Sequence, residues 1–274
     1  MTILESDNVQ HGVPESAVLL RDVTKTYDNG VAALGPLDLN VRAGEFISLL
    51  GPSGCGKSTA LRIIAGLNAP TTGTVHVAAR GAREKAKHGS RQDVGFVFQE
   101  PTLMPWATVR DNVLLPLDLA HVPRRDAAAR VDQALVQVGL EEFAAVYPRE
   151  LSGGMKMRVS LARALVTDPD ILLMDEPFAA LDEITRFRLN NDLLALWRKL
   201  HKTIIFVTHS VFESVYLSQR VLVMTPRPGR IAREFRIGDA EPRGEEFRTS
   251  PEYAAYCREV SAALAKASDD GAAR

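Results

Sequence analysis

The chain has 274 residues, of which 46% are hydrophobic and 24% are charged, and its formal net charge at pH 7 is -1. This length suits one large domain with inserted or appended segments, and it excludes a small module held together by disulfides. The near-neutral balance lacks the basic field of a protein whose main partner is nucleic acid, so no nucleic-acid partner is expected. Its two cysteines, Cys55 and Cys257, form no C-x-x-C pair and no zinc spacing, which fits free thiols in a reducing compartment.

The N-terminal segment, residues 1–16, mixes polar and acidic side chains and has neither the basic start nor the apolar centre of a signal peptide. We expect it to be flexible. The longest apolar runs, such as Ile204 to Val207, are far shorter than the roughly 20 residues that a membrane helix needs. Any role at a membrane therefore requires a separate partner chain.

Between Ala17 and Val41 the apolar residues come in short alternating groups that are interrupted by turn residues. This pattern predicts antiparallel strands and hairpins. Tyr27 stands at the edge of the region. Its ring is suited either to stacking on an adenine or to half-buried packing against a sheet, and the spacing alone leaves both open.

The next feature is a glycine-rich stretch that fits the pattern G-x-x-x-x-G-K-[ST] and lies between an apolar strand pattern at 46–50 and an apolar helical pattern at 59–65. Its residues are Gly51, Pro52, Ser53, Gly54, Cys55, Gly56, Lys57, Ser58 and Thr59. The three glycines allow positive φ and a close approach of the backbone to a polyphosphate. Lys57 adds a point charge for the β- and γ-phosphates, and Ser58 offers a hydroxyl to Mg²⁺. An ordinary glycine-rich turn is disfavoured because a strand and a helix flank the motif.

After this loop a strand is expected at 74–77, a solvated loop at 80–91, and a buried strand from Val94 to Phe98 that ends at Gln99. From about 102 to 165 the pattern becomes helical, with segments at 109–119 and 125–138 and a further helix after Ser152. This indicates a helical subdomain inserted into an α/β core. The apolar group at 103–106, which ends in Trp106, fits either core packing or a partner-docking surface.

Three polar groups stand at the starts and ends of later elements. Ser152 is suited to cap a helix at 156–165, and Gly153 and Gly154 leave backbone donors accessible at its start. The apolar strand at 171–176 ends in Asp175 and Glu176, where doubly wound sheets bind their ligands. Another apolar strand, at 203–209, ends in His209, for which a structural and a functional role remain equally open.

In the last part of the chain, the pattern at 184–200 predicts an amphipathic helix. A hairpin is expected at 221–237, with its turn at 226–229. A final helix and a disordered end at 268–274 follow. The final helix begins with Ser250 as cap and Pro251 in the first turn. Tyr256, Val260 and Leu264 give it an apolar stripe.

Taken together, these motifs resemble the nucleotide-binding subunits of ABC transporters over about 18–229. The resemblance rests on the order and spacing of the phosphate loop, Gln99, Leu151-Ser152-Gly153-Gly154, Met174-Asp175-Glu176-Pro177, Leu181-Asp182 and His209. It implies an α/β fold with a P-loop NTPase core, an antiparallel β subdomain and an inserted α-helical subdomain at about 102–165. The ATPase domain would span 17–230, and 231–274 would be a C-terminal extension.

The resemblance also implies roles for single residues. Tyr27 would stack on the adenine of ATP, and Gln99 would touch Mg²⁺ and the membrane partner. Asp175 would be the metal-linked acid, Glu176 the catalytic base, and His209 the contact to the γ-phosphate. The segment from Ser152 to Gly154 would meet ATP bound to the opposite subunit of a homodimer, with Asp182 nearby. Met155 and Ala179 depart from the family pattern, which commonly has glutamine and serine there, and neither change removes a phosphate donor.

Within the family, the segments 98–101, 103–106 and 111–113 resemble the nitrate/sulfonate/taurine importer branch, and pyrimidine-type importers share much of this pattern. The branch implies a peripheral ATPase at the cytoplasmic face of the inner membrane. Its partners would be a separate permease docking near Gln99 to Trp106 and, indirectly, an extracytoplasmic solute-binding protein. The alternatives are a soluble ABC ATPase acting on ribosomes or DNA, a small-molecule P-loop kinase, and a regulatory module without turnover.

Overall fold

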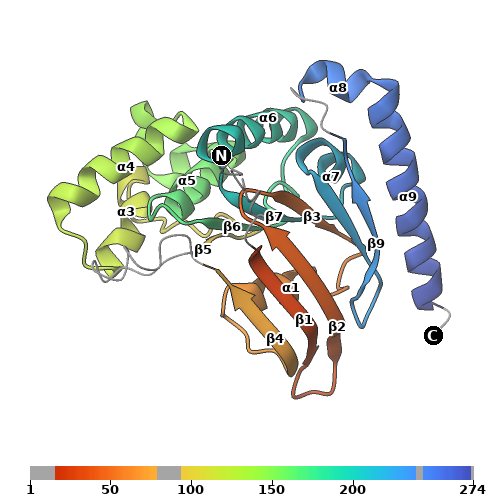
Figure 1. Cartoon of the computed structure of the whole chain (residues 1–274). Coiled ribbons are helices and arrows are strands. Elements are labelled where there is room, and N and C mark those ends of the chain that lie inside the picture. The colour runs from red at the N-terminus through yellow and green to blue at the C-terminus, as the bar shows by residue number, and fades with distance from the viewer. Residues whose placement is uncertain (1–15, 79–93, 239–242, 273–274) are drawn as a thin grey trace, which may run out of the picture.

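The computed structural model describes residues 16–78, 94–238 and 243–272. The expectations for 1–15 and for the loop at 80–91 lie outside these residues. Figure 1 shows a central sheet with helices on both faces, a smaller antiparallel sheet below it, and a group of helices beside one edge. At the opposite edge, the C-terminal helix runs alongside the last strand.

The strands and helices have the following bounds. The strands are β1 (Ser16–Thr26), β2 (Ala32–Arg42), β3 (Phe46–Leu50), β4 (Thr72–Val77), β5 (Val94–Val97), β6 (Ile171–Asp175), β7 (Thr203–Thr208), β8 (Arg220–Met224) and β9 (Ile231–Arg236). The α-helices are α1 (Lys57–Ile64), α3 (Val109–Leu119), α4 (Arg124–Val138), α5 (Gly153–Leu165), α6 (Glu183–Leu200), α7 (Val211–Leu217), α8 (Glu245–Thr249) and α9 (Pro251–Ala272). Two 3₁₀ turns, η1 (Glu141–Phe143) and η2 (Pro148–Glu150), lie between α4 and α5.

The central sheet has the strand order β5-β6-β7-β3-β8-β9, and only β9 is antiparallel to its neighbour. Leu50 at the end of β3 pairs with Thr208 of β7, and Asp175 at the end of β6 pairs with Val207. The carboxyl ends of these three strands therefore meet at one edge, where open parallel sheets bind ligands. The phosphate loop follows β3, Glu176 follows β6 and His209 follows β7, so all three lie at this edge.

The smaller sheet, with the order β2-β1-β4, confirms the antiparallel strands predicted for 17–41. Alternate residues of β2 are buried, as a strand with one solvated face requires. Helix α1 lies between the two sheets (Figure 1), and its Leu61 and Ile64 join Leu39 of β2 and Leu49 of β3 in one apolar cluster. This packing holds the phosphate loop, which precedes α1, against both sheets.

The inserted helical group consists of α3, α4 and α5, as predicted. Thr108 and Asp111 form a reciprocal capping box at the start of α3, and Gly139, with φ of 66°, ends α4. Helix α5 begins at Gly153, earlier than the predicted 156. The reason is local: the Ser152 hydroxyl accepts a hydrogen bond from Met155 N, so the first helical turn starts directly after the cap.

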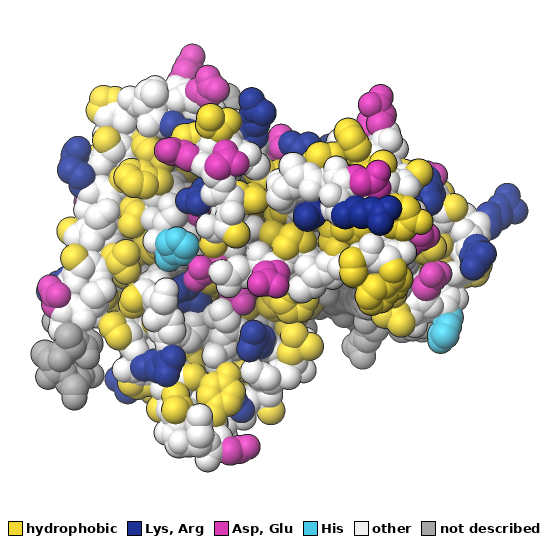
Figure 2. Space-filling model, turned by 180° about the vertical axis from the view of Figure 1, so that it is seen from behind, with side chains coloured by type: hydrophobic (Ala, Val, Ile, Leu, Met, Phe, Trp, Pro, Cys, Tyr) yellow, Lys and Arg dark blue, Asp and Glu magenta, His cyan; other side chains and the backbone are white. Residues whose placement is uncertain are grey.

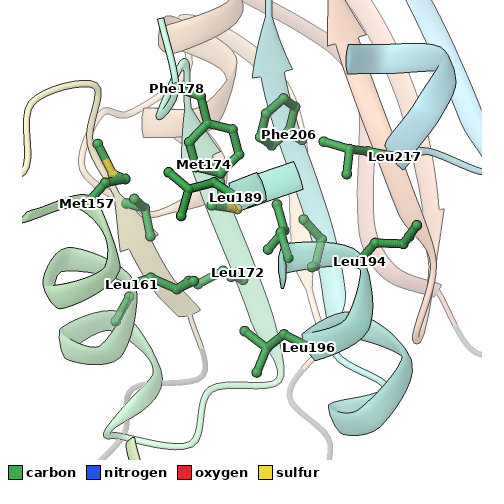
Figure 3. Packing of buried hydrophobic residues seen from close by; sticks show 14 of the residues in the cluster. Met157, Leu161, Leu172, Met174, Phe178, Leu189, Leu194, Leu196, Phe206 and Leu217 are labelled. Atoms are coloured by element: carbon green, nitrogen blue, oxygen red, sulfur yellow. The ribbon is translucent and has the colours of Figure 1, made fainter. Parts of the chain in front are cut away.

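One apolar cluster fastens this helical group to the central sheet (Figure 3). Met157 and Leu161 of α5 and Leu189 of α6 pack toward Met174 of β6, with Phe178 just beyond that strand. A single apolar cluster thus joins the start of α5 to the end of β6 and the start of α6. Close packing transmits small displacements between such elements.

The C-terminal part departs from the sequence predictions in two ways. The hairpin of β8 and β9 confirms the predicted turn, but β9 is a strand of the central sheet, so the sheet continues past 230. A short helix, α8, precedes the last one, and α9 continues to Ala272 although disorder was expected from Ser268. The extra length has a physical cause, because Ala267 is buried and Val260 fills the core face of the predicted stripe.

Candidate active site

The phosphate loop depends on two glycines with left-handed backbone. Gly54 has φ of 76° and Gly56 has φ of 105°, and a Cβ on Gly56 would lie 2.6 Å from the carbonyl oxygen of Ala33. Gly51 differs from the expectation, since it is not among the residues with positive φ; it is required for space, because its Cβ would lie 2.8 Å from Cys55 Sγ. The loop therefore has the tight backbone path that directs N–H groups toward a phosphate at the start of α1.

Lys57 is buried at the floor of this loop. Its Nζ donates to the carbonyl oxygens of Gly51, at 2.7 Å, and Pro52, at 3.1 Å. It also lies 3.5 Å from Glu176 Oε1, and its side chain is only 3% exposed. The ammonium charge is thus held inside the loop, where polyphosphate oxygens would displace carbonyl partners.

Ser58 and Asp175 meet across the site, since the Ser58 hydroxyl donates to Asp175 Oδ1 at 2.8 Å. Burial raises the pKa of the Asp175 carboxyl, the Ser58 hydrogen bond opposes that shift, and the nearby Glu176 charge adds to it. A hydroxyl and a carboxylate are hard oxygen donors of the kind that Mg²⁺ prefers. This pair fits the predicted metal position.

Glu176 follows Asp175 in a left-handed conformation, with φ of 46°. Backbone strain of this kind costs about 1–3 kcal/mol and is typical of functional sites. The conformation places Glu176 Oε2 at 3.0 Å from His209 Nδ1, while Oε1 faces Lys57. His209 keeps half of its side chain exposed. The structure therefore joins a lysine, a carboxylate and a histidine that come from three different strand ends.

The buried carboxylate of Glu213 holds the residue that precedes His209. Thr208 Oγ1 donates to Glu213 Oε2 at 2.6 Å and accepts from Ser210 N at 3.0 Å. Burial raises the pKa of the Glu213 carboxyl, against the Thr208 hydrogen bond and the nearby Arg186 charge. Glu213 thus holds the side chain of Thr208, which directly precedes His209, and the sequence did not single out this residue.

Lys57, Ser58 and Glu176 border a common cavity of about 510 Å³. Its lining residues are Tyr27, Asn29, Val31, Ala33, Ser53, Gly54, Gly56, Lys57, Ser58, Thr59, Gln99, Glu176 and Arg227. Tyr27 is half-buried here, and its hydroxyl lies 3.2 Å from Thr59 Oγ1. Gln99, just after β5, is exposed on the same cavity, so both predicted residues are brought to the phosphate loop.

Among the residues described, nine predicted site residues are absent from this lining. Five of them belong to the phosphate loop or bond to a residue of the lining, namely Gly51, Pro52, Cys55, Asp175 and His209. The other four are Ser152, Gly153, Gly154 and Asp182. Segment 152–154 lies against the start of α6 instead, since a Cβ on Gly154 would lie 2.6 Å from Thr185 Cγ2. Asp182 caps α6 by accepting from Thr185 N at 2.9 Å, and that hydrogen bond lowers the pKa of its carboxyl. Ser152, Gly153 and Asp182 are exposed, so this second group faces solvent.

Arg227 borders the cavity although the sequence identified only a turn at 226–229. Its Nε donates to the carbonyl oxygen of Gly54 at 2.7 Å. The sequence did indicate where this turn lies. It follows β8, a parallel strand next to β3, and ligands bind at the carboxyl ends of such strands.

A phosphate loop between a parallel strand and a helix, with acids at the end of a neighbouring strand, defines a P-loop nucleotide-binding protein. The family model described as ABC transporter matches residues 34–179, which is more than half of the chain. The chain therefore belongs to the ABC transporter family, and it is an ATPase coupled to transport. Among the helices that the structure describes, none has the length and hydropathy needed to span a bilayer.

Named relatives cover most of the chain. A taurine import ATP-binding protein, TauB, of Rhizobium johnstonii is 42% identical and covers 89% of this chain and 93% of its own. A nitrate import ATP-binding protein, NrtD, of Synechocystis sp. is 43% identical, with coverage of 85% and 88%. A dimeric ATP-binding cassette solved in a post-hydrolysis state with ADP and Pi is 36% identical, with a TM-score of 0.68 and coverage of 81% and 99%.

Proposed function

We propose that this chain is the ATP-hydrolysing subunit of an importer, in which two copies close on two ATP molecules and thereby move a separate permease. The observation that carries the proposal is the division of the site. Lys57 and Glu176 line one cavity and His209 bonds to Glu176, whereas the group formed by 152–154 and Asp182, three of whose residues are exposed, lies outside that cavity. A second copy supplies the missing half. The dimeric relative bound to ADP and Pi supports this arrangement.

In the proposed reaction, the oxygen of a water molecule attacks the γ-phosphorus of ATP, and the bond to the β–γ bridging oxygen breaks. Glu176 orients that water and takes its proton. Lys57 neutralises charge on the leaving and transferred phosphates, and His209, held by Glu176, contacts the γ-phosphate. A magnesium ion held by Ser58 and Asp175, with Gln99 nearby, would add charge neutralisation at the phosphates.

We also propose that the permease docks on the surface near Gln99 to Trp106. The apolar side chains of this loop differ in exposure: Leu103 packs on the core, whereas Trp106 is 77% exposed. Arg163 fixes the loop by donating to the carbonyl oxygens of Pro101 and Thr102 at 2.7 and 2.9 Å. A groove of about 1320 Å³ lies beside it, between α1, β4, β5 and α3. Exposed apolar residues around a groove are typical of protein interfaces.

The solute is proposed to be a small anion or zwitterion of the nitrate, sulfonate or taurine type, because two relatives are named for nitrate and taurine import. The permease would place this subunit at the cytoplasmic face of the inner membrane, with an extracytoplasmic solute-binding protein on the other side. Figure 2 shows acidic and basic side chains interspersed over one face of the molecule, without a continuous basic field there. That face offers no electrostatic track for nucleic acid.

The test uses the variant Glu176→Gln in the full chain. We expect it to bind Mg²⁺-ATP, to lose steady-state hydrolysis, and to double in mass by light scattering with ATP but not with ADP. Lys57→Ala serves as the control and should stay monomeric with either nucleotide. Unimpaired hydrolysis by Glu176→Gln would count against the catalytic assignment. Loss of co-purification with the permease on Trp106→Ala tests the docking surface.

A further inference from the structure

Arg227 is an exposed cation at the rim of the nucleotide cavity. One of its nitrogens, Nε, is engaged with the carbonyl oxygen of Gly54 at 2.7 Å. Its two terminal nitrogens make no hydrogen bond or ion pair with any part of the chain that the structure describes. The guanidinium of Arg227 therefore keeps hydrogen-bond donors that are not used within the described residues, while its Nε contacts the phosphate loop.

The turn that bears Arg227 is seated firmly on the site. Gly229 N donates to Ala33 O at 3.0 Å, and Gly35 N donates to Gly229 O at 3.2 Å. The contact between Gly229 and the phosphate loop leaves no room for a side chain, since a Cβ there would lie 2.0 Å from Cys55 O. The guanidinium thus stands on a backbone that is fixed on two sides, which reduces the entropy lost when it binds a ligand.

We propose that Arg227 is a nucleotide-binding residue whose terminal nitrogens donate to the phosphate oxygens of bound ATP and ADP. A guanidinium is planar, stays charged, and matches phosphate oxygens in geometry. Lys57 supplies the buried charge of the cavity and Arg227 supplies a second charge at its rim. This inference rests on the proposed nucleotide site and adds a residue to it.

Arg227 contributes to nucleotide binding and not to the chemical step. Arg227 is not among the hydrogen-bond or ion-pair partners of Glu176 and His209, which the structure joins to each other and to Lys57. Removing the guanidinium should therefore raise the KM for ATP and leave kcat within about twofold. For an exposed charge pair we expect about fivefold weaker ADP binding, equivalent to about 1 kcal/mol.

The experiment titrates the full-length chain with ADP by calorimetry and measures KM and kcat for ATP. It compares Arg227→Met and Arg227→Lys with Arg230→Met. Arg230 is a matched control, because it lies in the same turn and its Nε also donates to a glycine carbonyl, Gly35 O, at 3.0 Å, but it does not border the cavity. We expect a fivefold loss for Arg227→Met, an intermediate loss for Arg227→Lys, which keeps the charge without the planar group, and values within twofold of the wild type for Arg230→Met. The loss in Arg227→Met should be smaller at high salt.

An equal loss in Arg230→Met would overturn the inference, because it would make the effect one of turn structure. Unchanged ADP affinity in Arg227→Met would overturn it as well. Lys57→Ala separates this outcome from failure of the whole site. If Lys57→Ala weakens ADP binding and Arg227→Met does not, the nucleotide cavity stands and only the role of Arg227 falls.

Discussion

Gly229→Ala perturbs the contact that seats the β8–β9 turn on the phosphate loop. The added Cβ would lie 2.0 Å from Cys55 O and 3.0 Å from Met224 Cε. The first neighbour is backbone and cannot rotate away. Since Cβ contacts under 3.0 Å are essentially never seen in proteins, the turn or the loop must move by about 1 Å.

The size of the effect follows from that displacement. Overpacking of a buried contact costs about 1–3 kcal/mol of unfolding free energy. A shift of about 1 Å in a loop that positions substrate costs function up to about 100-fold, so we expect ADP affinity to fall at least tenfold. Unfolding in urea and calorimetric titration with ADP measure the two quantities separately.

Gly244→Ala is the control for Gly229→Ala. Among the residues that the structure describes, no atom lies within 4 Å of the Cβ that it would add, and its φ is -138°. It should leave ADP affinity unchanged and stability within about 0.5 kcal/mol. Wild-type stability and affinity in Gly229→Ala would show that the turn does not sit on the phosphate loop, which would refute the reasoning.

Three further predictions concern stability. Arg220→Met should lower the urea-unfolding free energy by about 2–3 kcal/mol, because the buried Glu45 carboxylate loses a partner that reaches both its oxygens at 3.0 Å. For Glu213, burial raises the folded-state pKa above the unfolded value of 4.5, so its stabilising effect is complete below that value and is lost as pH rises through the folded pKa. Glu213→Gln should therefore gain in melting temperature relative to the wild type as the pH rises above 4.5, and a difference that does not change with pH would contradict this. Ser160→Ala should be neutral or stabilise by up to about 1 kcal/mol in the same urea assay, since the buried Ser160 hydroxyl has no hydrogen-bond partner within 16–78, 94–238 and 243–272. A clear loss of stability would show that this hydroxyl has a partner elsewhere.

The convergence of the site was predictable because it follows from sheet geometry. Apolar strands at 46–50, 171–175 and 203–208 each end in a polar group, and parallel strands bring such ends to one edge. The pairing of Asp175 with Val207 then carries Glu176 to His209. Sheet geometry alone therefore predicts that these groups lie at one edge of the sheet, and the family resemblance adds their roles.

The position of Arg227 was not predictable in the same way. Its contact with Gly54 joins residues 173 apart in sequence, and it depends on how a hairpin turn settles on a loop. The backbone of Gly51 and the length of α9 share this dependence. Gly51 is fixed by Cys55 Sγ, and α9 continues because Ala267 finds a buried place. Tertiary packing decides all three. For Arg227 the sequence indicates only that its turn follows a strand of the sheet, and not the contact with Gly54.

The central claim is that one complete ATP site draws its phosphate loop from one copy and its 152–154 segment from another. Mixing two inactive variants tests it directly: Lys57→Ala, which loses the phosphate loop, and Ser152→Arg, which loses the opposing segment. Each mixed dimer would hold one intact site, so we expect an equimolar mixture to hydrolyse ATP clearly faster than either variant alone. The upper limit is about a quarter of the wild-type rate, the value for random pairing. A mixture that hydrolyses ATP no faster than the average of its two components would contradict the account.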